Sequence, residues 1–399
     1  MYKPSKKTLE KYADLLVNFA LNSGKGVKKD EIVMCIVDDV AKPLLIELHK
    51  TLLKAGAHPI MRMIPTGINK DFFVHASDGQ IVFFPEEYQK ARCDLIDHQI
   101  GVLSEVDPQE LKDINPEKIM KSADARKKVR EWLDEKERRG KFTWTMGLYG
   151  TEGMAKEANM SLEEYWQEII HACYLDKENP KEEWKKIMNE QERIKKELNS
   201  LDIDYVHAKG ENIDLKVKIG PRRQWLGGNG RNIPSYEIFT SPDWRGTEGY
   251  IYFNQPLYRY GNILRDIRIE FKEGLVSKAE AGEGQEILEK MIKRENANKV
   301  GEFSLTDSRF SRITKFMANT LYDENVGGEN GNMHIAVGMA YKDAFEGDAR
   351  KVKKDEWEKM GFNYSPEHTD IITTEERKVT AYLLDGGSKV IYEHGKFTV

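Results

Sequence analysis

The chain has 399 residues, 39% of them hydrophobic and 32% charged, which is an ordinary globular composition and long enough for two or three domains. Its 62 basic and 67 acidic residues give a net charge of −5, which gives no electrostatic argument for nucleic acid as a partner. No segment approaches the roughly 20 apolar residues of a membrane span, and the polar residues near the N-terminus predict an amphipathic helix, not a signal peptide. We therefore expect a cytoplasmic protein with neither nucleic acid nor membrane as a partner.

The three cysteines, Cys35, Cys93 and Cys173, lie far apart and form no CxxC motif. This spacing favours neither a zinc ribbon nor a disulfide framework. We expect all three to be core residues or free thiols.

The first hundred residues alternate between predicted helices and predicted strands. Apolar residues at helical spacing predict a helix over residues 6–21. Residues 31–37 and 58–65 are predicted strands, and residues 43–55 predict the helix that joins them. A further strand is expected near residues 95–103. This β-α-β order predicts a parallel sheet covered by helices.

Asp38 and Asp39 follow the first predicted strand at its carboxyl end. Ligands bind at this edge of parallel sheets, so the pair is a candidate ligand site. The alternative, which we favour, is a solvated loop that caps the next helix. No glycine-rich fingerprint follows the strand, so dinucleotide binding is not predicted.

Residues 115–199 are predicted to be mostly helical and are heavily charged. We interpret the tryptophans in this segment as the packing faces of amphipathic helices. Ser161 and Glu164 have the spacing of a capping box that opens one of these helices. The segment is therefore expected to be a helical extension of the N-terminal domain.

Beyond residue 200 the pattern changes to short strands. Residues 214–219 alternate between apolar and polar side chains, as a half-buried strand does. Further strands are predicted over residues 236–240, 249–253, 267–271, 275–279, 378–384 and 389–392, with a helix over residues 284–296. We expect an α/β N-terminal domain with a helical extension (residues 1–200) and a strand-rich α+β C-terminal domain (residues 201–399).

His368 and Asp370 are two residues apart, near the C-terminus. In an extended strand this spacing places both side chains on one face. An imidazole and a carboxylate on one face can share a metal ion or form a hydrogen-bonded pair, and the spacing alone leaves both interpretations open.

Four more candidates precede this pair: Glu237, Glu302, His334 and Tyr341. Taken singly, the two glutamates could be solvent-facing strand residues, and His334 could be a core histidine. Tyr341 shares a face with His334 if the segment between them is helical, and points away if it is extended. Together the six residues form an oxygen-rich, sulfur-free set that suits one or two divalent ions. Two ions about 3.5–4 Å apart would clamp a water for hydrolytic chemistry.

Several segments then occur in a fixed order: residues 236–244, 246–251, 301–302, 321–325, 334–341 and 368–370. In this order they resemble the thermophilic metallo-aminopeptidases of peptidase family M29, the aminopeptidase T and aminopeptidase S type. Residues 163–184 and 210–216 are similar to that family as well. The resemblance covers residues 150–399 and is looser over the N-terminal part.

The resemblance implies a metal-dependent aminopeptidase, a hydrolase that releases N-terminal residues from short peptides with free N-termini. Its implied cofactors are two divalent metal ions with a bridging water between them, zinc or cobalt first and manganese or magnesium as alternatives. The implied ligands are Glu237, Glu302, His334, Tyr341, His368 and Asp370. Glu302 is the implied bridging ligand and a candidate proton shuttle, and Tyr341 is a catalytic candidate as a phenolate. By the same resemblance the enzyme is a homodimer.

Two stretches depart from the pattern of the family. Residues 326–332 form a longer segment before His334, and residues 371–374 replace the Phe and Gly expected after Asp370. Neither departure removes an implied ligand. Both leave the substrate preference open.

Other residues and other functions stay open at this point. Glu248 and Glu324 are alternative candidates for the proton shuttle. Arg222, Arg223 and Trp225 either line a substrate cleft or serve as surface charge and core packing, and we favour the second interpretation. The alternative functions are a metal-dependent amidase acting on a non-peptide substrate and a non-catalytic ligand-binding protein.

Overall fold

The computed structural model describes residues 2–399 and divides into two compact units. The first unit comprises Met1–Lys185, Asn229–Ser235 and Tyr260–Asn262. The second comprises Lys186–Gly228, Tyr236–Arg259 and Ile263–Val399. Each unit therefore combines segments that are distant in sequence. The predicted division into domains near residue 200 stays a prediction.

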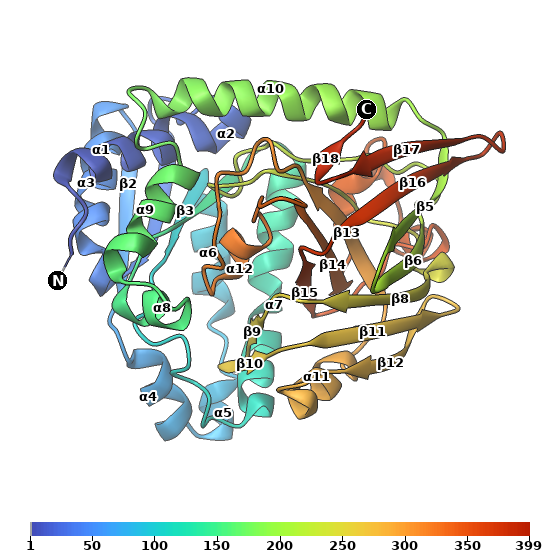
Figure 1. Cartoon of the computed structure of the whole chain (residues 1–399). Helices are drawn as coiled ribbons and strands as arrows, with labels where there is room; N and C mark the ends of the chain where they lie inside the picture. Colours follow the sequence, from blue (N-terminus) through green and yellow to red (C-terminus); the bar gives the residue numbers. More distant parts are fainter. Residues whose placement is uncertain (1) are drawn as a thin grey trace. The chain divides into compact units, whose positions relative to one another are not determined.

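The first unit is built on a parallel sheet with the strand order β2-β1-β3-β4, of which Figure 1 labels β2 and β3. Its strands are β1 (Ile32–Asp38), β2 (His58–Ile64), β3 (His98–Leu103) and β4 (Thr143–Leu148). Neighbouring strands pair in parallel throughout. The helix α3 (Lys42–Lys54) joins β1 to β2, so the predicted β-α-β unit is confirmed.

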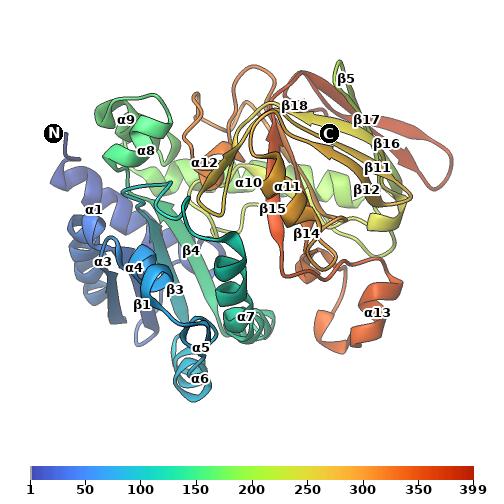
Figure 2. The same cartoon turned by 90° about the horizontal axis from the view of Figure 1, so that it is seen from below.

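Helices cover both faces of this parallel sheet, as Figure 2 shows for α1 and α3 on one side and α7 on the other. In chain order, the helices of this half of the chain besides α3 are α1 (Lys6–Leu15), α2 (Leu21–Gly24), α4 (Ile68–His75), α5 (Asp78–Ile81), α6 (Glu86–Leu95), α7 (Pro116–Arg138), α8 (Glu152–Glu157), α9 (Leu162–Ala172) and α10 (Pro180–Asn199), of which α10 begins in the first unit and ends in the second. The hydroxyl of Tyr12 in α1 accepts a hydrogen bond from the backbone N–H of Leu148 at 2.8 Å. On the other side Met34, Ile96 and Phe142 form a buried cluster against Leu133 of α7. Burial on both faces explains the continuous apolar run of β1.

Two local features of the first unit differ from the sequence-based expectation. Strand β4 lies inside the stretch that we expected to be mostly helical, because pairing with β3 selects the extended conformation for its short aromatic and β-branched run. The first helix is interrupted by a five-residue π-helix, Leu16–Ala20, after α1 ends at Leu15. The predicted capping box of Ser161 and Glu164 opens α9 as expected.

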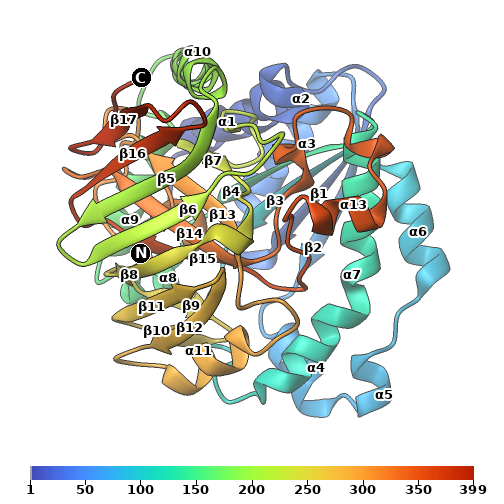
Figure 3. The same ribbon diagram turned by 90° about the vertical axis from the view of Figure 1, so that its right-hand side faces the viewer.

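The second unit contains an eight-stranded sheet with the order β12-β11-β8-β6-β5-β16-β17-β18, much of which is visible in Figure 3. Its strands pair in antiparallel fashion and are β5 (Ile203–Gly210), β6 (Ile213–Lys218), β8 (Glu248–Phe253), β11 (Ile267–Lys272), β12 (Leu275–Glu280), β16 (Arg377–Leu383), β17 (Ser388–Glu393) and β18 (Lys396–Phe397). All the predicted strands of this half of the chain are present except for shifts of one or two residues at their ends. The chain thus combines a parallel sheet with antiparallel sheets.

A second antiparallel sheet of this unit has the order β15-β14-β13-β7. Its strands are β7 (Glu237–Thr240), β13 (Val300–Thr306), β14 (Asn332–Gly338) and β15 (His368–Thr373). Every residue of β7, β13 and β14 is buried. Charged side chains on these strands are therefore withheld from bulk water, which strengthens their mutual interactions.

Shorter elements complete the chain: the hairpin of β9 (Leu257–Arg259) and β10 (Asn262–Leu264), and the helices α11 (Gln285–Ile292), α12 (Thr320–Asp323) and α13 (Lys354–Lys359). Cys35, Cys93 and Cys173 are buried free thiols, as expected. Within residues 2–399, no helix combines the length and the apolar character needed to cross a membrane.

Candidate metal centre

Strand register places several of the predicted site residues on one face of the four-stranded sheet. Glu302 on β13 lies opposite Ala336 on β14, and Ala336 lies opposite Asp370 on β15. Directly paired residues point to the same face, and so do residues two apart on one strand. His334, two residues before Ala336, therefore joins Glu302 and Asp370 on this face.

The two remaining strand residues of the predicted set reach the same face. His368 lies opposite Gly338 on β14, which is two residues from Ala336. Glu237 lies opposite Thr306, four residues from Glu302 on β13. His368 and Asp370 therefore share one strand face, as their spacing predicts.

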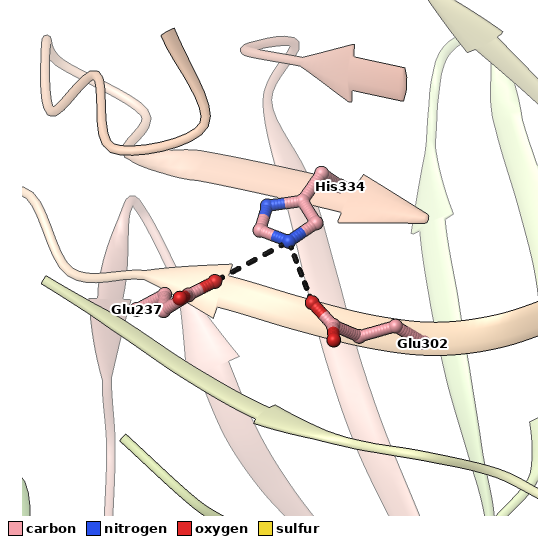
Figure 4. Close-up of side chains that lie close together, drawn as sticks. All are labelled: Glu237, Glu302 and His334. Atoms are coloured by element: carbon pink, nitrogen blue, oxygen red, sulfur yellow. Dashed lines mark hydrogen bonds and ion pairs between the residues drawn. The ribbon is translucent and has the colours of Figure 1, made fainter. Parts of the chain in front are cut away.

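The first group is formed by Glu237, Glu302 and His334, and its two carboxylates converge on the imidazole (Figure 4). Its Nε2 lies 3.0 Å from Oε1 of Glu302 and 3.4 Å from Oε2 of Glu237. Oδ1 of Asp370 is 3.8 Å from the same nitrogen. The hydroxyl of Ser304 donates to Oε2 of Glu237 at 3.3 Å, which orients that carboxylate.

The second group is formed by Glu302, His368 and Asp370. Nε2 of His368 lies 3.4 Å from Oδ1 of Asp370 and 3.9 Å from Oε2 of Glu302. Its Nδ1 lies 2.8 Å from the carbonyl oxygen of Met339 and donates to it, which leaves Nε2 to face the carboxylates. Glu302 thus turns one oxygen toward each histidine and belongs to both groups.

Burial and mutual repulsion perturb the protonation of this cluster. Burial and the charge of Glu302 raise the pKa of Glu237 to about 7. Burial opposes the charged form of His334, but the hydrogen bond to Glu302 and the charges of Asp370 and Glu237 outweigh it and raise the pKa of His334 to about 9. Against its own burial, the two histidines hold the pKa of Asp370 well below its usual range. Glu237 and His334 therefore hold protons near neutral pH, and a bound metal ion would displace them.

The donor atoms fit a bound metal. In each group one atom from every residue lies within 4.8 Å of the others, a separation that one ion can span. Oδ1 of Asp370 is buried and has no hydrogen-bond donor among the described residues, so a cation would satisfy it. Carboxylate and imidazole ligands suit zinc, cobalt or manganese. The small residues Ala336 and Gly338 separate the longer side chains on this face.

Tyr341 follows β14, so the segment between His334 and Tyr341 is extended and turns into a loop. This loop brings the Tyr341 ring to 4.5 Å from the ring of His368, centroid to centroid. Its backbone N–H donates to the hydroxyl of Ser241 at 2.8 Å, and its ring also contacts Phe239. The structure therefore places Tyr341 beside the second group.

Three residues near the cluster have roles that the sequence did not indicate. Glu367 is buried and pairs with both Arg259 and Arg294. Glu367 directly precedes His368, and this adjacency was the one available signal. The charge of Arg259 also reaches Asp370 and contributes, after the two histidines, to the lowered pKa of that carboxyl.

The two alternative proton shuttles differ sharply. Glu324 is buried, and burial followed by the charges of Glu237, Asp370 and Glu302 raises its pKa well above the usual value. Glu248 is exposed, and its carboxylate accepts the backbone N–H of Glu273 in a turn.

The three residues that we considered for a substrate cleft, Arg222, Arg223 and Trp225, pack on aromatic rings, and Arg223 also hydrogen-bonds to backbone carbonyls. The guanidinium of Arg223 stacks on Phe362 at 3.5 Å and donates to the carbonyl oxygens of Ser241 and Met360. Arg222 lies over Phe345, and Trp225 is buried edge-on against Phe303. The interpretation as packing and surface charge agrees with these contacts.

Asp38 and Asp39, at the end of β1 in the first unit, make local hydrogen bonds. Oδ2 of Asp38 accepts from the hydroxyl of Ser104 at 2.9 Å, and Asp39 accepts from the hydroxyl of Thr66. Neither aspartate belongs to a group with metal-ligand spacing in the described part of the chain.

Comparisons with known proteins match the chain to metallopeptidases. A family model described as "Thermophilic metalloprotease (M29)" matches residues 5–397. Aminopeptidase PepS of Streptococcus thermophilus is 26% identical over 99% of this chain and 98% of its own length, and aminopeptidase AmpS of Bacillus subtilis is 26% identical over 98% of each. Aminopeptidase T of Thermus thermophilus is 27% identical over 73% of this chain and 74% of its own length. The solved structure of wild-type AmpT from Thermus thermophilus has the same fold, with a TM-score of 0.85 and 22% identity over 99% of this chain and all of that one.

Proposed function

Since the chain belongs to the M29 family of thermophilic metalloproteases, we propose that it is a metal-dependent aminopeptidase that releases N-terminal residues from short peptides. The family and the enzyme class inferred from the sequence, a hydrolase of the metallo-aminopeptidase type, are confirmed by the match over residues 5–397 and by relatives named as aminopeptidases. The substrate, short peptides with a free N-terminus, belongs to the proposal.

One observation carries the proposed dinuclear site: Glu302 is shared by two groups of ligand atoms. Its Oε1 faces His334 and its Oε2 faces His368. A carboxylate with one oxygen in each group could bridge two neighbouring ions. We assign Glu237 and His334 to one ion, His368 and Asp370 to the other, and Glu302 to both.

Two divalent ions held by these residues would polarise the scissile carbonyl and lower the pKa of the attacking water. Zinc or cobalt is the first choice for these ions, with manganese or magnesium as alternatives. Tyr341 would join as a phenolate from the side of His368, where the positive charge favours its ionised form. Ser304 holds the carboxylate of Glu237, and the carbonyl of Met339 holds the ring of His368, in the orientations that these roles need.

A carboxylate must also take a proton from the attacking water and give it to the leaving amine. Glu302 was the first candidate, but a bridging role occupies both of its oxygens. Glu324 is the better candidate because it is buried, its carboxyl senses the charges of Glu237, Asp370 and Glu302, and it belongs to neither ligand group. We assign the proton transfer to Glu324.

The side chains on either side of Glu324 accept hydrogen bonds from backbone N–H groups. The carboxylate of Asp323 accepts the N–H groups of Met317 and Asn319 at 2.6 and 2.8 Å. The side-chain oxygen of Asn325 accepts the N–H of Tyr236 at 2.6 Å, one residue before Glu237. These bonds hold Glu324 in register with the candidate ligands.

The oligomeric state and the location are part of the proposal on the strength of the resemblance to the family. We propose a homodimer in the cytoplasm. Sedimentation of the purified protein tests the first statement, and cell fractionation tests the second.

The proposed function is tested with purified protein stripped of metal by a chelator. Titration with zinc, cobalt, manganese and magnesium, followed by elemental analysis, should give two ions per chain. The loaded protein should hydrolyse leucyl-p-nitroanilide and Leu-Gly-Gly and should leave N-acetylated peptides intact. Hydrolysis of non-peptide amides alone would point to an amidase, and a chain that retains no divalent ion would contradict the proposal.

A further inference from the structure

Two arginines share one carboxylate beside the candidate metal centre. Nη2 of Arg259 lies 2.7 Å from Oε2 of Glu367, and Nε of Arg294 lies 2.9 Å from Oε1 of the same residue. The side chain of Glu367 is only 2% exposed. Glu367 therefore joins both guanidinium groups in one ion-pair cluster.

The two arginines differ in their access to solvent. The side chain of Arg294 is 11% exposed, whereas that of Arg259 is 32% exposed. A buried arginine on a buried carboxylate is what a structural ion pair looks like. Arg259 is instead held by Glu367 through Nη2 and exposes part of its side chain to solvent.

Arg259 also lies close to the candidate ligands. Its ion-pair partner, Glu367, directly precedes His368. The backbone carbonyl of Glu367 accepts the N–H of Met339 at 2.6 Å, and the carbonyl of Met339 in turn accepts a hydrogen bond from the His368 ring. The positive charge of Arg259 is felt at Asp370. A cation fixed at the border between a reaction centre and solvent is suited to hold an anionic part of a substrate.

We propose that Arg259 is a specificity residue that binds a carboxylate of the substrate, an inference that rests on the proposed aminopeptidase function. A guanidinium has five N–H donors in one plane, so Arg259 can hold Glu367 through Nη2 and still donate to a substrate carboxylate, whereas an ammonium is a single point charge. Holding of Arg259 by Glu367 reduces the entropy lost when it binds the substrate. Arg294, on the other oxygen of Glu367, is a structural residue.

A substrate carboxylate can come from two sources. One is the α-carboxylate of a dipeptide, which lies one residue beyond the scissile bond. The other is the side chain of an N-terminal Asp or Glu. Both have the same chemistry, and the experiment separates them.

The experiment measures equilibrium binding, so that it does not depend on turnover. Reduced-bond analogues, in which CH₂–NH replaces the amide, cannot be hydrolysed. Calorimetry with the metal-loaded protein compares the Leu-Gly analogue as acid and as amide, and compares Glu-Gly-amide with Gln-Gly-amide analogues. Elemental analysis and melting temperature accompany each variant, Arg259→Gln, Arg259→Lys and Arg294→Gln, as controls for metal content and folding.

We expect the wild-type protein to bind the carboxylate form of one pair about tenfold or more tightly than its uncharged partner, as a charged hydrogen bond permits. Arg259→Gln should abolish this preference with metal content unchanged, Arg259→Lys should reduce it, and Arg294→Gln should keep it. The lysine variant decides the question if the glutamine variant does not fold.

A preference in the first pair identifies the α-carboxylate, and a preference in the second identifies the acidic side chain. The inference is overturned if neither pair shows a preference, or if the preference survives in Arg259→Gln. A parallel hydrolysis assay on leucyl-p-nitroanilide tests the proposed aminopeptidase function separately from the role of Arg259. Its failure, with the binding preference intact, rejects the proposed reaction and leaves the role of Arg259 standing.

Discussion

Glu302 and His334 face each other across neighbouring antiparallel strands, with 3.0 Å between Oε1 and Nε2. The other oxygen of Glu302 faces His368 at 3.9 Å. Within residues 2–399, Glu302 is the one residue common to both groups of ligand atoms. The two proposed ion positions therefore depend on the same carboxylate.

Substitution of Glu302→Gln should disable both positions at once. The amide keeps the shape of the side chain but cannot bridge two cations, so we expect loss of bound metal and a fall of about a hundredfold or more in kcat/KM. Elemental analysis measures the metal, and melting curves with and without zinc measure the stabilisation that binding supplies. The matched control is Glu248→Gln, because Glu248 is exposed and bonded in a turn. Two tightly bound ions in Glu302→Gln would remove this residue from the bridge.

The metal-free protein should lose stability as the pH rises from about 6 to about 9. Burial and the neighbouring carboxylate raise the pKa of Glu237 to about 7, and the surrounding carboxylates, acting against burial, raise that of His334 to about 9. The folded state thus binds more protons than the unfolded state in this range, and stability falls with pH wherever that holds. The lowered pKa of Asp370 acts only in more acidic solution.

Melting curves of chelator-treated protein between pH 6 and pH 9 measure this slope. Divalent metal displaces the stored protons, so added zinc should raise the melting temperature more at pH 8 than at pH 6. Glu237→Gln should flatten the slope of the metal-free protein. A melting temperature that rises with pH in the absence of metal would contradict this account.

Much of the candidate site could be predicted because each of its residues stands out against its local pattern. Glu237, Glu302 and His334 are charged or polar residues inside short apolar strands, where burial of a lone polar group is costly. His368 and Asp370 have the two-residue spacing that a strand converts into a shared face. Local pattern thus marked these residues as candidates, and the resemblance to the family joined them into one set, but neither said which pairs meet.

The pairing itself depends on strand register, which the local sequence does not specify. That Glu302 reaches both histidines follows from the order β15-β14-β13-β7 and the opposition of Glu302 to Ala336. The same limit explains why Arg259 and Arg294 were missed, since they meet Glu367 from segments 108 and 73 residues away. Strand β4 was missed because its six residues are specified by pairing with β3 more than by their own pattern.

Glu324→Gln should separate proton transfer from metal binding. The amide cannot accept or give up a proton, so kcat should fall by about a hundredfold to ten-thousandfold, in the range of general acid–base catalysis. Because Glu324 belongs to neither ligand group, the variant should still bind two ions. KM should change little, and the acid limb of the pH–rate profile should disappear. Loss of metal in parallel with activity would make Glu324 a ligand instead.

Gly338→Ala should damage the site through the backbone. Gly338 lies opposite His368 and has φ of +106°, where L side chains are strained. An added Cβ would also meet the carbonyl oxygen of Glu367 at 2.2 Å, a rigid neighbour that directly precedes His368. We expect a loss of about 2–4 kcal/mol in the free energy of unfolding, together with weaker metal binding.

Two other glycines provide controls for this substitution. Gly328 has φ of +57° and open space around it, so Gly328→Ala reports backbone strain without the clash and should cost about 1 kcal/mol. Gly79 lies in α5 with no positive φ and nothing within 4 Å, so Gly79→Ala should be neutral or stabilising by about 0.5–1 kcal/mol. Denaturant unfolding of the metal-free variants measures the three free energies, and calorimetric titration with zinc measures the affinity. Of the three variants, only Gly338→Ala should weaken zinc binding, because only there does the new methyl group contact the segment that carries His368 and Asp370. Equal zinc affinity in all three variants would show that this contact does not position the ligands.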